Sequence, residues 1–397
     1  MARHFTYVIV GGGLAGASAV EGIREHDRAG TIALFGAEEH VPYDRPPLSK
    51  GLWLGKNTLE DLPIHDELFY SSNGVHLYLG VEVTELIPSE HRLITRDGDQ
   101  YTYDKLLLAT GGSPRRLPFG EGLLHYYRTV EDYLWLKDAA EHAETFLLIG
   151  GGFIGAELAA ALTLNGKTVT MIFPEQSILQ NVLPPELAAF VTDYYRSKGV
   201  RILNGELPAH AARADGGITV ITQSGKTVTA EVALAAIGLA VHTELAQRAG
   251  LRVQNGVVVD AFLRTSDPDI YAAGDVAVFP AALLDEMVRI EHWDNARAQG
   301  RHAGSNMAGA DMPFEYLPFF YSDLFDLGFE AVGKLDSRMK TVADWKEPFR
   351  EGVVYYLEDD RVKGVLLWNV WEKVDAARAL IGLKKAYTSP EEVRGLL

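Results

Sequence analysis

The sequence predicts an α/β protein in which one strand, loop and helix motif occurs twice and a smaller α+β domain follows. The first observation is GGGLAG at residues 11–16, which follows the apolar run FTYVIV and precedes an Ala-rich helical pattern. The second is GGGFIG at residues 150–155, which follows TFLLI and also precedes an Ala-rich pattern. A strand, a glycine loop and a helix in this order indicate a Rossmann-like dinucleotide-binding domain, so we expect two such domains.

Each glycine of the two loops has a separate task. The first makes the tight turn, the second lets a pyrophosphate approach the backbone, and the third lets the helix pack closely on the strand. Backbone amides at the start of the helix then hold the phosphates. A single loop of this kind has many uses, but two in the same context predict two nucleotide sites. The predicted contacts are Gly11, Gly13, Leu14, Ala15 and Gly16 in the first loop, and Gly150, Gly152, Phe153, Ile154 and Gly155 in the second.

The remaining elements follow the order expected of two doubly wound units. After the first loop come strands at TIALFG (31–36) and LLLATGG (106–112), and after the second come TVTMIF (168–173) and AEVALAAIG (230–238). The chain then returns to strand character at TSDPDIYAAGD (265–275) and to a helix at 295–307. The last part contains VVYYLEDDRVKGVLLWNV (353–370), a hairpin pattern with a polar turn, and the helical pattern VDAARALIGL (374–383).

Composition excludes several functions. The chain has 397 residues, a net charge of −17 and no cysteine. Without cysteine it has no disulfide, no Fe–S ligand and no redox-active thiol pair. The acidic balance argues against nucleic acid as a partner and disfavours an acidic ferredoxin, unless a local basic patch exists. We find no membrane span, signal peptide or metal motif, and expect a cytoplasmic protein.

Strand ends distinguish the two nucleotide sites. In the first unit, Ala109, Thr110 and Gly111 end one apolar strand, and Gly274 and Asp275 end another. Glycine at these ends lets the backbone pass close to a flat ligand, and Asp275 is placed to bind a polyol such as a ribityl chain. We therefore predict FAD in the first unit and a transient NAD(H) in the second. Further predicted cofactor contacts are Val83, Arg116, Ile237 and Gly238.

The acid after the second strand of each unit is expected to bind the adenosine ribose. In the second unit this is Glu175, whose carboxylate accepts from a 2′-hydroxyl and repels a 2′-phosphate, so NADH is predicted over NADPH. In the first unit Glu38 and Glu39 are both candidates, and their spacing does not separate them. A solvated loop carboxylate is the alternative at each position.

HVPYDRPPLSK (40–50) and EHWDNARAQG (291–300) resemble the flavin reductases of the oxygenase-ferredoxin-reductase and apoptosis-inducing-factor group. The resemblance covers essentially the whole chain and implies a glutathione-reductase-like arrangement of FAD, NAD and C-terminal domains. Four segments, FPE, IEHWDNA, YSDLFDLGFEAVG and GVLLWNVW, are more similar to the apoptosis-inducing-factor branch. A departure occurs after AAIG, where relatives often have a Gly-x-x-Pro-Asn turn and this chain has GLAVHTEL. The predicted domains are 1–120 with 244–315 for FAD, 121–243 for NAD and 316–397 at the C-terminus.

The resemblance also implies roles for single residues. It places Arg45 at the FAD phosphates, Lys50 near flavin N5 and Glu157 as the partner of Lys50. An ammonium near N5 stabilises the anionic reduced flavin, and a carboxylate partner keeps a buried lysine charged. The alternatives are a surface lysine in a Pro-rich loop and an acidic residue in the first turn of a helix.

The segment EHWDN directly precedes a helical pattern, so its amides can point at the pyrimidine end of a flavin. We expect His292 and Trp293 to flank the ring and Glu291 to face the nicotinamide pocket. Core packing is the alternative for the two aromatic residues. The predicted catalytic residues are Lys50, Glu157, Glu291 and His292.

Together these observations predict an FAD-dependent NADH oxidoreductase that passes electrons to a ferredoxin, a rubredoxin or another acceptor. The alternative is an NADH-sensing flavoprotein, similar to apoptosis-inducing factor, whose reduced FAD–NAD charge-transfer complex controls dimerisation or partner binding. The sequence leaves a homodimer open and does not identify the acceptor.

Overall fold

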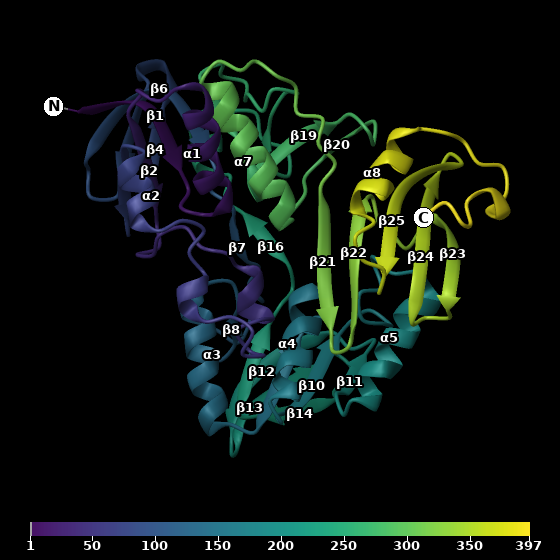
Figure 1. Ribbon diagram of the computed structural model, residues 1–397. Coiled ribbons are helices and arrows are strands. Elements are labelled where there is room, and N and C mark those ends of the chain that lie inside the picture. Colours follow the sequence, from purple (N-terminus) through teal and green to yellow (C-terminus); the bar gives the residue numbers. More distant parts are fainter. Residues whose placement is uncertain (1) are drawn as a thin grey trace. The chain divides into compact units, whose positions relative to one another are not determined.

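The computed structural model describes residues 2–397 (Figure 1). The chain forms two compact units. Unit 1 comprises the chain up to Asp44 together with Glu60–Ser113 and Ala240–Phe319. Unit 2 comprises Arg45–Leu59, Pro114–Leu239 and Phe320–Leu397. The chain passes from one unit to the other within strands β7 (Gly112–Pro114) and β16 (Leu239–Val241), and also after Asp44, Leu59 and Phe319.

Unit 1 is built on a mixed sheet whose parallel half carries the first glycine loop. β1 lies between β2 and β6 and is parallel to both, while β18 is parallel to β6. β1 and β2 are buried along most of their length, and their apolar side chains form the core of this sheet. The sheet comprises β3 (Val75–Leu79), β2 (Ile32–Gly36), β1 (Arg3–Val10), β6 (Gln100–Leu108), β5 (Arg92–Thr95), β4 (Val83–Ile87) and β18 (Ile270–Ala272).

Helices α1 and α7 pack directly against each other in unit 1, and small residues make this possible. A Cβ at Gly300 would lie 2.2 Å from the Ala15 carbonyl oxygen, and one at Gly304 would lie 2.1 Å from that of Ala19. The predicted helix at 295–307 is confirmed and begins two residues earlier. Unit 1 also contains α1 (Leu14–His26), α2 (Glu67–Ser72), α6 (Glu244–Arg248), α7 (Trp293–Met307), η3 (Pro88–Glu90), η4 (Gly274–Val276), β17 (Val257–Val258), β19 (Ala277–Ala281) and β20 (Glu286–Val288).

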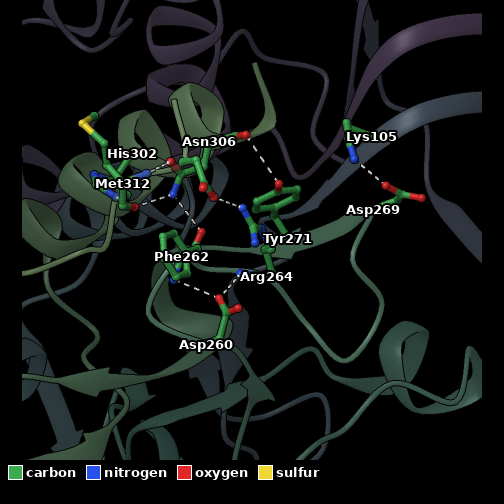
Figure 2. Close-up of polar contacts among 10 residues, drawn as sticks. Lys105, Asp260, Phe262, Arg264, Asp269, Tyr271, His302, Asn306 and Met312 are labelled. Carbon is green, nitrogen blue, oxygen red and sulfur yellow. Dashed lines mark hydrogen bonds and ion pairs between the residues drawn. The ribbon is translucent and has the colours of Figure 1, made fainter. Parts of the chain in front are cut away.

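Polar contacts fix the C-terminal end of α7 (Figure 2). The Asn306 side-chain amide donates to the carbonyl oxygens of Phe262 and Met312, both at 2.9 Å, and its oxygen accepts from the Met312 amide. Asp260 accepts from the amides of Phe262 and Arg264, which closes the adjoining loop. The helix is thereby held at a defined position beside the strand that leads into Gly274 and Asp275.

Unit 2 repeats the parallel arrangement around the second glycine loop. β9 is parallel to β10 and β15, so the order of strands around the loop matches that in unit 1. The main sheet comprises β11 (Arg201–Asn204), β10 (Thr168–Phe173), β9 (Thr145–Ile149), β15 (Val232–Ala235) and β8 (His125–Tyr126). A second sheet comprises β12 (Pro208–Ala214), β13 (Gly217–Thr222) and β14 (Thr227–Ala230). The helices here are η1 (Pro46–Ser49), α3 (Val130–His142), α4 (Phe153–Leu164) and α5 (Pro185–Ser197). η2 (Leu59–Asp61) begins at the last residue of segment 45–59 and continues into unit 1.

The C-terminal part of unit 2 is an α+β segment with an antiparallel sheet. The predicted hairpin is confirmed, because β24 pairs antiparallel with β25. The predicted final helix is α8 (Val374–Gly382), and η5 (Pro390–Glu392) follows it. The sheet comprises β21 (Phe319–Leu324), β22 (Leu327–Gly333), β25 (Arg361–Trp368), β24 (Glu351–Glu358) and β23 (Lys340–Glu347).

The units group the chain differently from the three predicted domains. Segment 45–59, which the prediction assigns to the FAD domain, lies in unit 2, where η1 packs on α3 and α4. The C-terminal segment belongs to the same unit. The division into FAD, NAD and C-terminal domains stays a prediction. The two nucleotide loops lie in different units.

Candidate functional site

The first glycine loop has the geometry that a pyrophosphate requires. Gly11 has a φ of +131°, and a Cβ there would lie 2.0 Å from the Ala109 carbonyl oxygen. A Cβ at Gly16 would lie 2.1 Å from the Gly11 carbonyl oxygen. Gly13 is different, because, apart from Gly13 and its two chain neighbours, the described residues place no atom within 4 Å of the position its Cβ would take. The outer glycines are therefore required by packing, and the middle one leaves room for a ligand.

The second loop has the same pattern. Gly150 has a φ of +122°, and its Cβ would lie 2.2 Å from the Ala236 carbonyl oxygen. At Gly155 the Cβ would lie 2.3 Å from the Gly150 carbonyl oxygen. Around the Cβ position of Gly152, the described residues other than Gly152 and its two chain neighbours again place no atom within 4 Å. Both loops therefore offer the same open cradle.

The helices after these loops begin without an acid, which sets them apart from the other α-helices of residues 2–397. Neither α1 nor α4 has a side-chain cap at its first residue or an acid in its first turn. By contrast, α3 begins with a capping box formed by Thr129 and Asp132. The first amides of α1 and α4 are thus left for a ligand, and no carboxylate in these turns repels a phosphate. FAD and NAD(H), the predicted cofactors, each have a pyrophosphate that fits such a cradle.

The structure distinguishes Glu38 from Glu39 by their contacts. The Tyr43 hydroxyl donates to the Glu38 carboxylate at 2.5 Å, while Glu39 is exposed. Glu175 lies two residues beyond β10, and its backbone carbonyl accepts from the Gly205 amide. Glu38 and Glu175 occupy equivalent places after the second strand of each unit.

The ends of β6 and β18 lie together in unit 1, as the sequence predicts. The Ala273 amide donates to the Leu108 carbonyl, which aligns the segments that lead to Thr110 and Asp275. The Thr110 hydroxyl donates to the His242 carbonyl at 2.8 Å. The Gln299 side chain accepts from the Gly274 amide at 2.9 Å, so α7 fixes this turn.

The segment that precedes α7 is anchored by charged and polar contacts. His292 occupies the N-cap position of the helix without a side-chain cap hydrogen bond. Trp293 is the first residue of α7, and its indole Nε1 donates to Asp44 at 2.6 Å. Glu291 forms an ion pair with Arg289 at 2.6 Å, and Arg289 also donates to the Asp275 carbonyl. Burial lowers the pKa of His292 to about 4, so its imidazole is neutral at neutral pH.

Lys50 and Glu157 form a buried ion pair in unit 2. The distance from Lys50 Nζ to Glu157 Oε1 is 2.7 Å, and the side chains are 13% and 3% exposed. Lys50 directly follows η1, and Glu157 lies in the second turn of α4, just after the glycine loop. The contact predicted from the resemblance is confirmed, and the alternatives of a surface lysine and a first-turn acid are wrong.

The other predicted residues fall into separate groups. Arg45 donates to the Arg128 carbonyl at 2.9 Å, which holds the loop that carries Lys50. Arg116 is exposed, and its guanidinium lies 4.9 Å from the centre of the Tyr126 ring. Val83 lies in unit 1 at the start of the antiparallel pair β4 and β5. In unit 2, Phe153 and Ile154 begin α4, while Ile237 and Gly238 follow β15.

Sequence reasoning missed the side chains that support these residues. Tyr43, Gln299 and Asp44 each hold a predicted residue in unit 1. Ser49 and Ser322 both donate to Glu157. Ser49 lies within the segment PPLSK and Ser322 within YSDLFD. Neither motif indicates that its serine donates to Glu157.

Comparison with known proteins identifies the family. Residues 5–300 match the family described as pyridine nucleotide-disulphide oxidoreductase. Residues 303–348 and 343–383 match the C-terminal family of apoptosis-inducing factor, described as mitochondrion-associated. The chain belongs to the pyridine nucleotide-disulphide oxidoreductase family, and the predicted fold and group are confirmed.

Individual relatives include both branches of the predicted group. Apoptosis-inducing factor 1, mitochondrial, of Dictyostelium discoideum is 36% identical, with 96% of this chain and 78% of that protein covered. The ferredoxin–NAD(+) reductase component of the anthranilate 1,2-dioxygenase system of Burkholderia cepacia is 35% identical, with coverages of 94% and 93%. The crystal structure of a covalent putidaredoxin reductase–putidaredoxin complex matches with a TM-score of 0.90 and 33% identity, covering 97% of this chain and 94% of that one.

Proposed function

We propose that this chain is an FAD-dependent NADH oxidoreductase that passes electrons to a ferredoxin-type protein, a rubredoxin being a related acceptor. The observation on which this proposal rests is the combination of two open pyrophosphate cradles with one buried lysine–glutamate pair. The glutamate of that pair lies just after the second cradle. Relatives named as ferredoxin–NAD(+) reductase and putidaredoxin reductase support the assignment. The first cradle, with Glu38 and Asp275, would hold FAD, and the second, with Glu175, would hold NADH.

The reaction balances as a hydride transfer followed by two single-electron transfers. NADH loses a hydride, which is two electrons and one proton, and leaves as NAD⁺. Bound FAD would supply the group that accepts a hydride and releases electrons singly. Two acceptor molecules take one electron each, and the proton goes to solvent. In this proposal the Lys50 ammonium stabilises the added negative charge, and Glu157 keeps that ammonium charged.

The absence of cysteine decides between reactions within the family. The family takes its name from disulphide chemistry, which needs a redox-active thiol pair. This sequence contains no cysteine. Electrons that reach the flavin must therefore leave it without a protein dithiol, and a one-electron protein acceptor meets that requirement. FAD is expected to be bound non-covalently, since there is no cysteine for a thioether link.

A second candidate is an NADH-sensing flavoprotein that holds the reduced state and changes its partners. The match of the C-terminal segment to the apoptosis-inducing-factor family favours it. In that case the reduced protein with bound NAD⁺ would persist in air, and a dimer equilibrium would follow the redox state. A homodimer is thus part of this candidate and is open for the first.

We also propose a cytoplasmic location and no nucleic-acid partner, in line with the charge of −17. Among the residues that the structure describes, no helix has the length and apolar character to cross a membrane.

Rapid mixing with NADH tests the two candidates. The purified, FAD-loaded protein is reduced with NADH without oxygen and then mixed with either a plant-type or putidaredoxin-type ferredoxin or air. Fast reoxidation by a ferredoxin supports the first candidate. Reduced protein that persists with both, and a dimer peak that appears on reduction in size-exclusion chromatography, would support the second. A correctly folded protein that cannot take up FAD would overturn both.

A further inference from the structure

Two serine hydroxyls share the Glu157 carboxylate with Lys50. Ser49 Oγ donates to Oε2 at 2.6 Å, and Ser322 Oγ donates to Oε1 at 2.7 Å, the same oxygen that binds Lys50 Nζ. Ser49 is 4% exposed and Ser322 is fully buried. Both carboxylate oxygens are therefore engaged by neutral donors in addition to the lysine.

The two serines come from distant parts of unit 2. Ser49 is the last residue of η1 and precedes Lys50, whereas Ser322 lies in β21 of the C-terminal sheet. The residues before Ser322 on the same strand also contact the site. The Phe320 ring packs edge-on against Phe153 at 5.5 Å, and the Tyr321 ring centre lies 5.3 Å from Lys50 Nζ. The first strand of the C-terminal sheet is thus built into the pair.

The distances indicate which protonation state the serines favour. Hydrogen bonds from a hydroxyl to an ionised carboxylate measure about 2.5–2.7 Å, and both serine contacts lie in that range. A buried ion pair can escape its desolvation cost if the lysine passes its proton to the carboxylate. Donors on the carboxylate oppose that transfer, because they stabilise the charged form.

Two tyrosines are the other ionisable side chains that the described contacts place beside the pair. The first is Tyr195 of α5, whose hydroxyl donates to the Ala156 carbonyl at 3.1 Å. Burial and, to a lesser extent, the Glu157 charge raise the pKa of Tyr195. Tyr321 faces Lys50 from β21. The strands beside α4, β9 and β10, contain no ionisable residue. The two serines are therefore the neutral donors that the described contacts place directly on the Glu157 carboxylate.

We propose that Ser322, together with Ser49, is a positioning residue that holds Glu157 ionised and so keeps the proton on Lys50. This inference rests on the proposed function and deepens it. It gives the C-terminal sheet a role in flavin reduction, since a strand of that sheet supplies one of the two donors.

The test uses the FAD-loaded protein with S322A, S322T and S49A. We expect S322A to slow flavin reduction by NADH about tenfold, a typical effect of one hydrogen bond to a charged group, while KM for NADH stays within twofold. A tenfold weaker stabilisation of the reduced flavin also lowers its two-electron midpoint potential by about 30 mV. S322T keeps the hydroxyl and should restore both values. S49A removes the donor from the other oxygen and gives the same test if S322A does not fold.

Infrared difference spectra between oxidised and reduced protein report the proton directly. S322A should show a protonated-carboxyl C=O band that wild type and S322T lack, and E157Q in the S322A background should remove it. S305A is the control for loss of a buried serine, because Ser305 is 4% exposed and donates only to backbone carbonyls. It should leave rate, potential and spectrum unchanged.

K50A distinguishes a failure of the serine inference from a failure of the role proposed for Lys50. If K50A lowers the rate and the potential while S322A and S49A match wild type without a carboxyl band, the inference fails and the proposed function stands. If K50A also matches wild type, the role proposed for Lys50 fails together with this inference. Only a wild-type protein whose FAD is not reduced by NADH would overturn the proposed function.

Discussion

The two glycine loops share one local geometry but differ in what surrounds them. In each loop, a Cβ on the first or third glycine of the fingerprint would lie 2.0–2.3 Å from a backbone carbonyl oxygen. The second glycine leaves room for a ligand. Helix α1, after the first loop, packs along α7 through glycine contacts. Helix α4, after the second, carries the buried Glu157. The same cradle is therefore fixed within a packed helix pair in one unit and joined to an ion pair in the other.

The acids of the two units show the same contrast. Glu38 is held by the Tyr43 hydroxyl at 2.5 Å. For Glu175, the structure of residues 2–397 shows no side-chain partner. A restrained acid loses less conformational entropy when it binds a ribose, whereas a free acid must be ordered by each ligand. This difference suits a retained cofactor in unit 1 and an exchanging one in unit 2.

The largest expected effect comes from filling the two cradles. Neither Gly13 nor Gly152 has a positive φ, and their Cβ positions are open, so G13V and G152V should fold. The added side chain would occupy the space of the pyrophosphate. We expect G13V to be purified without flavin, and G152V to keep its yellow colour while KM for NADH rises about 100-fold, the loss of ~2.7 kcal/mol.

Absorbance spectra, circular dichroism and KM measurements check this pair. G16A and G155A are the controls for packing, since their Cβ atoms would lie 2.1 and 2.3 Å from carbonyl oxygens, and both should lower the thermal midpoint. A flavin-loaded G13V, or a G152V with unchanged KM, would show that the cradles do not bind as proposed.

The second prediction concerns the ion pair that only unit 2 has. Removing one partner leaves a buried charge, so K50A and E157A should each slow flavin reduction, by about 10²-fold for K50A. The double variant should cost less than the sum of the singles, because coupled groups are not additive. K50A should also lower the flavin potential. Stopped-flow reduction by NADH for the three variants decides this, and strict additivity would mean that the residues act separately.

The sequence predicted most of the fold because the signals are local. Strand β1, the β24–β25 hairpin and helix α7 follow from apolar periodicity and glycine position. The contact between Lys50 and Glu157 required a resemblance, since 107 positions separate them. Ser322 could not be predicted as a donor, because it lies 165 positions from Glu157 and a serine within a strand has no distinguishing pattern. Glu38 and Glu39 are adjacent, and only the contact with Tyr43 separates them.

The third prediction tests nucleotide choice in unit 2. Glu175 should favour NADH over NADPH by at least about tenfold, because repulsion of one phosphate is worth roughly 1.4 kcal/mol. E175A should narrow the ratio of kcat/KM values for the two nucleotides. E39A, which removes an exposed acid from the other unit, is the matched control and should leave the ratio unchanged. Equal efficiency with both nucleotides in the wild type would contradict the assignment of Glu175.

The smallest effect is expected where unit 1 restrains its acid. Y43F removes the hydroxyl that donates to Glu38 but keeps the ring, which is 6% exposed. Glu38 then has to be ordered by the ligand, so the Kd for FAD should rise about threefold to tenfold, the net value of a typical hydrogen bond. Titration of the flavin-free protein with FAD measures it. E38Q should cost more than Y43F, and the double variant should cost about the same as E38Q, since Tyr43 acts through Glu38. A Y43F effect that persists in the E38Q background would assign Tyr43 a role of its own and remove the contrast between the two acids.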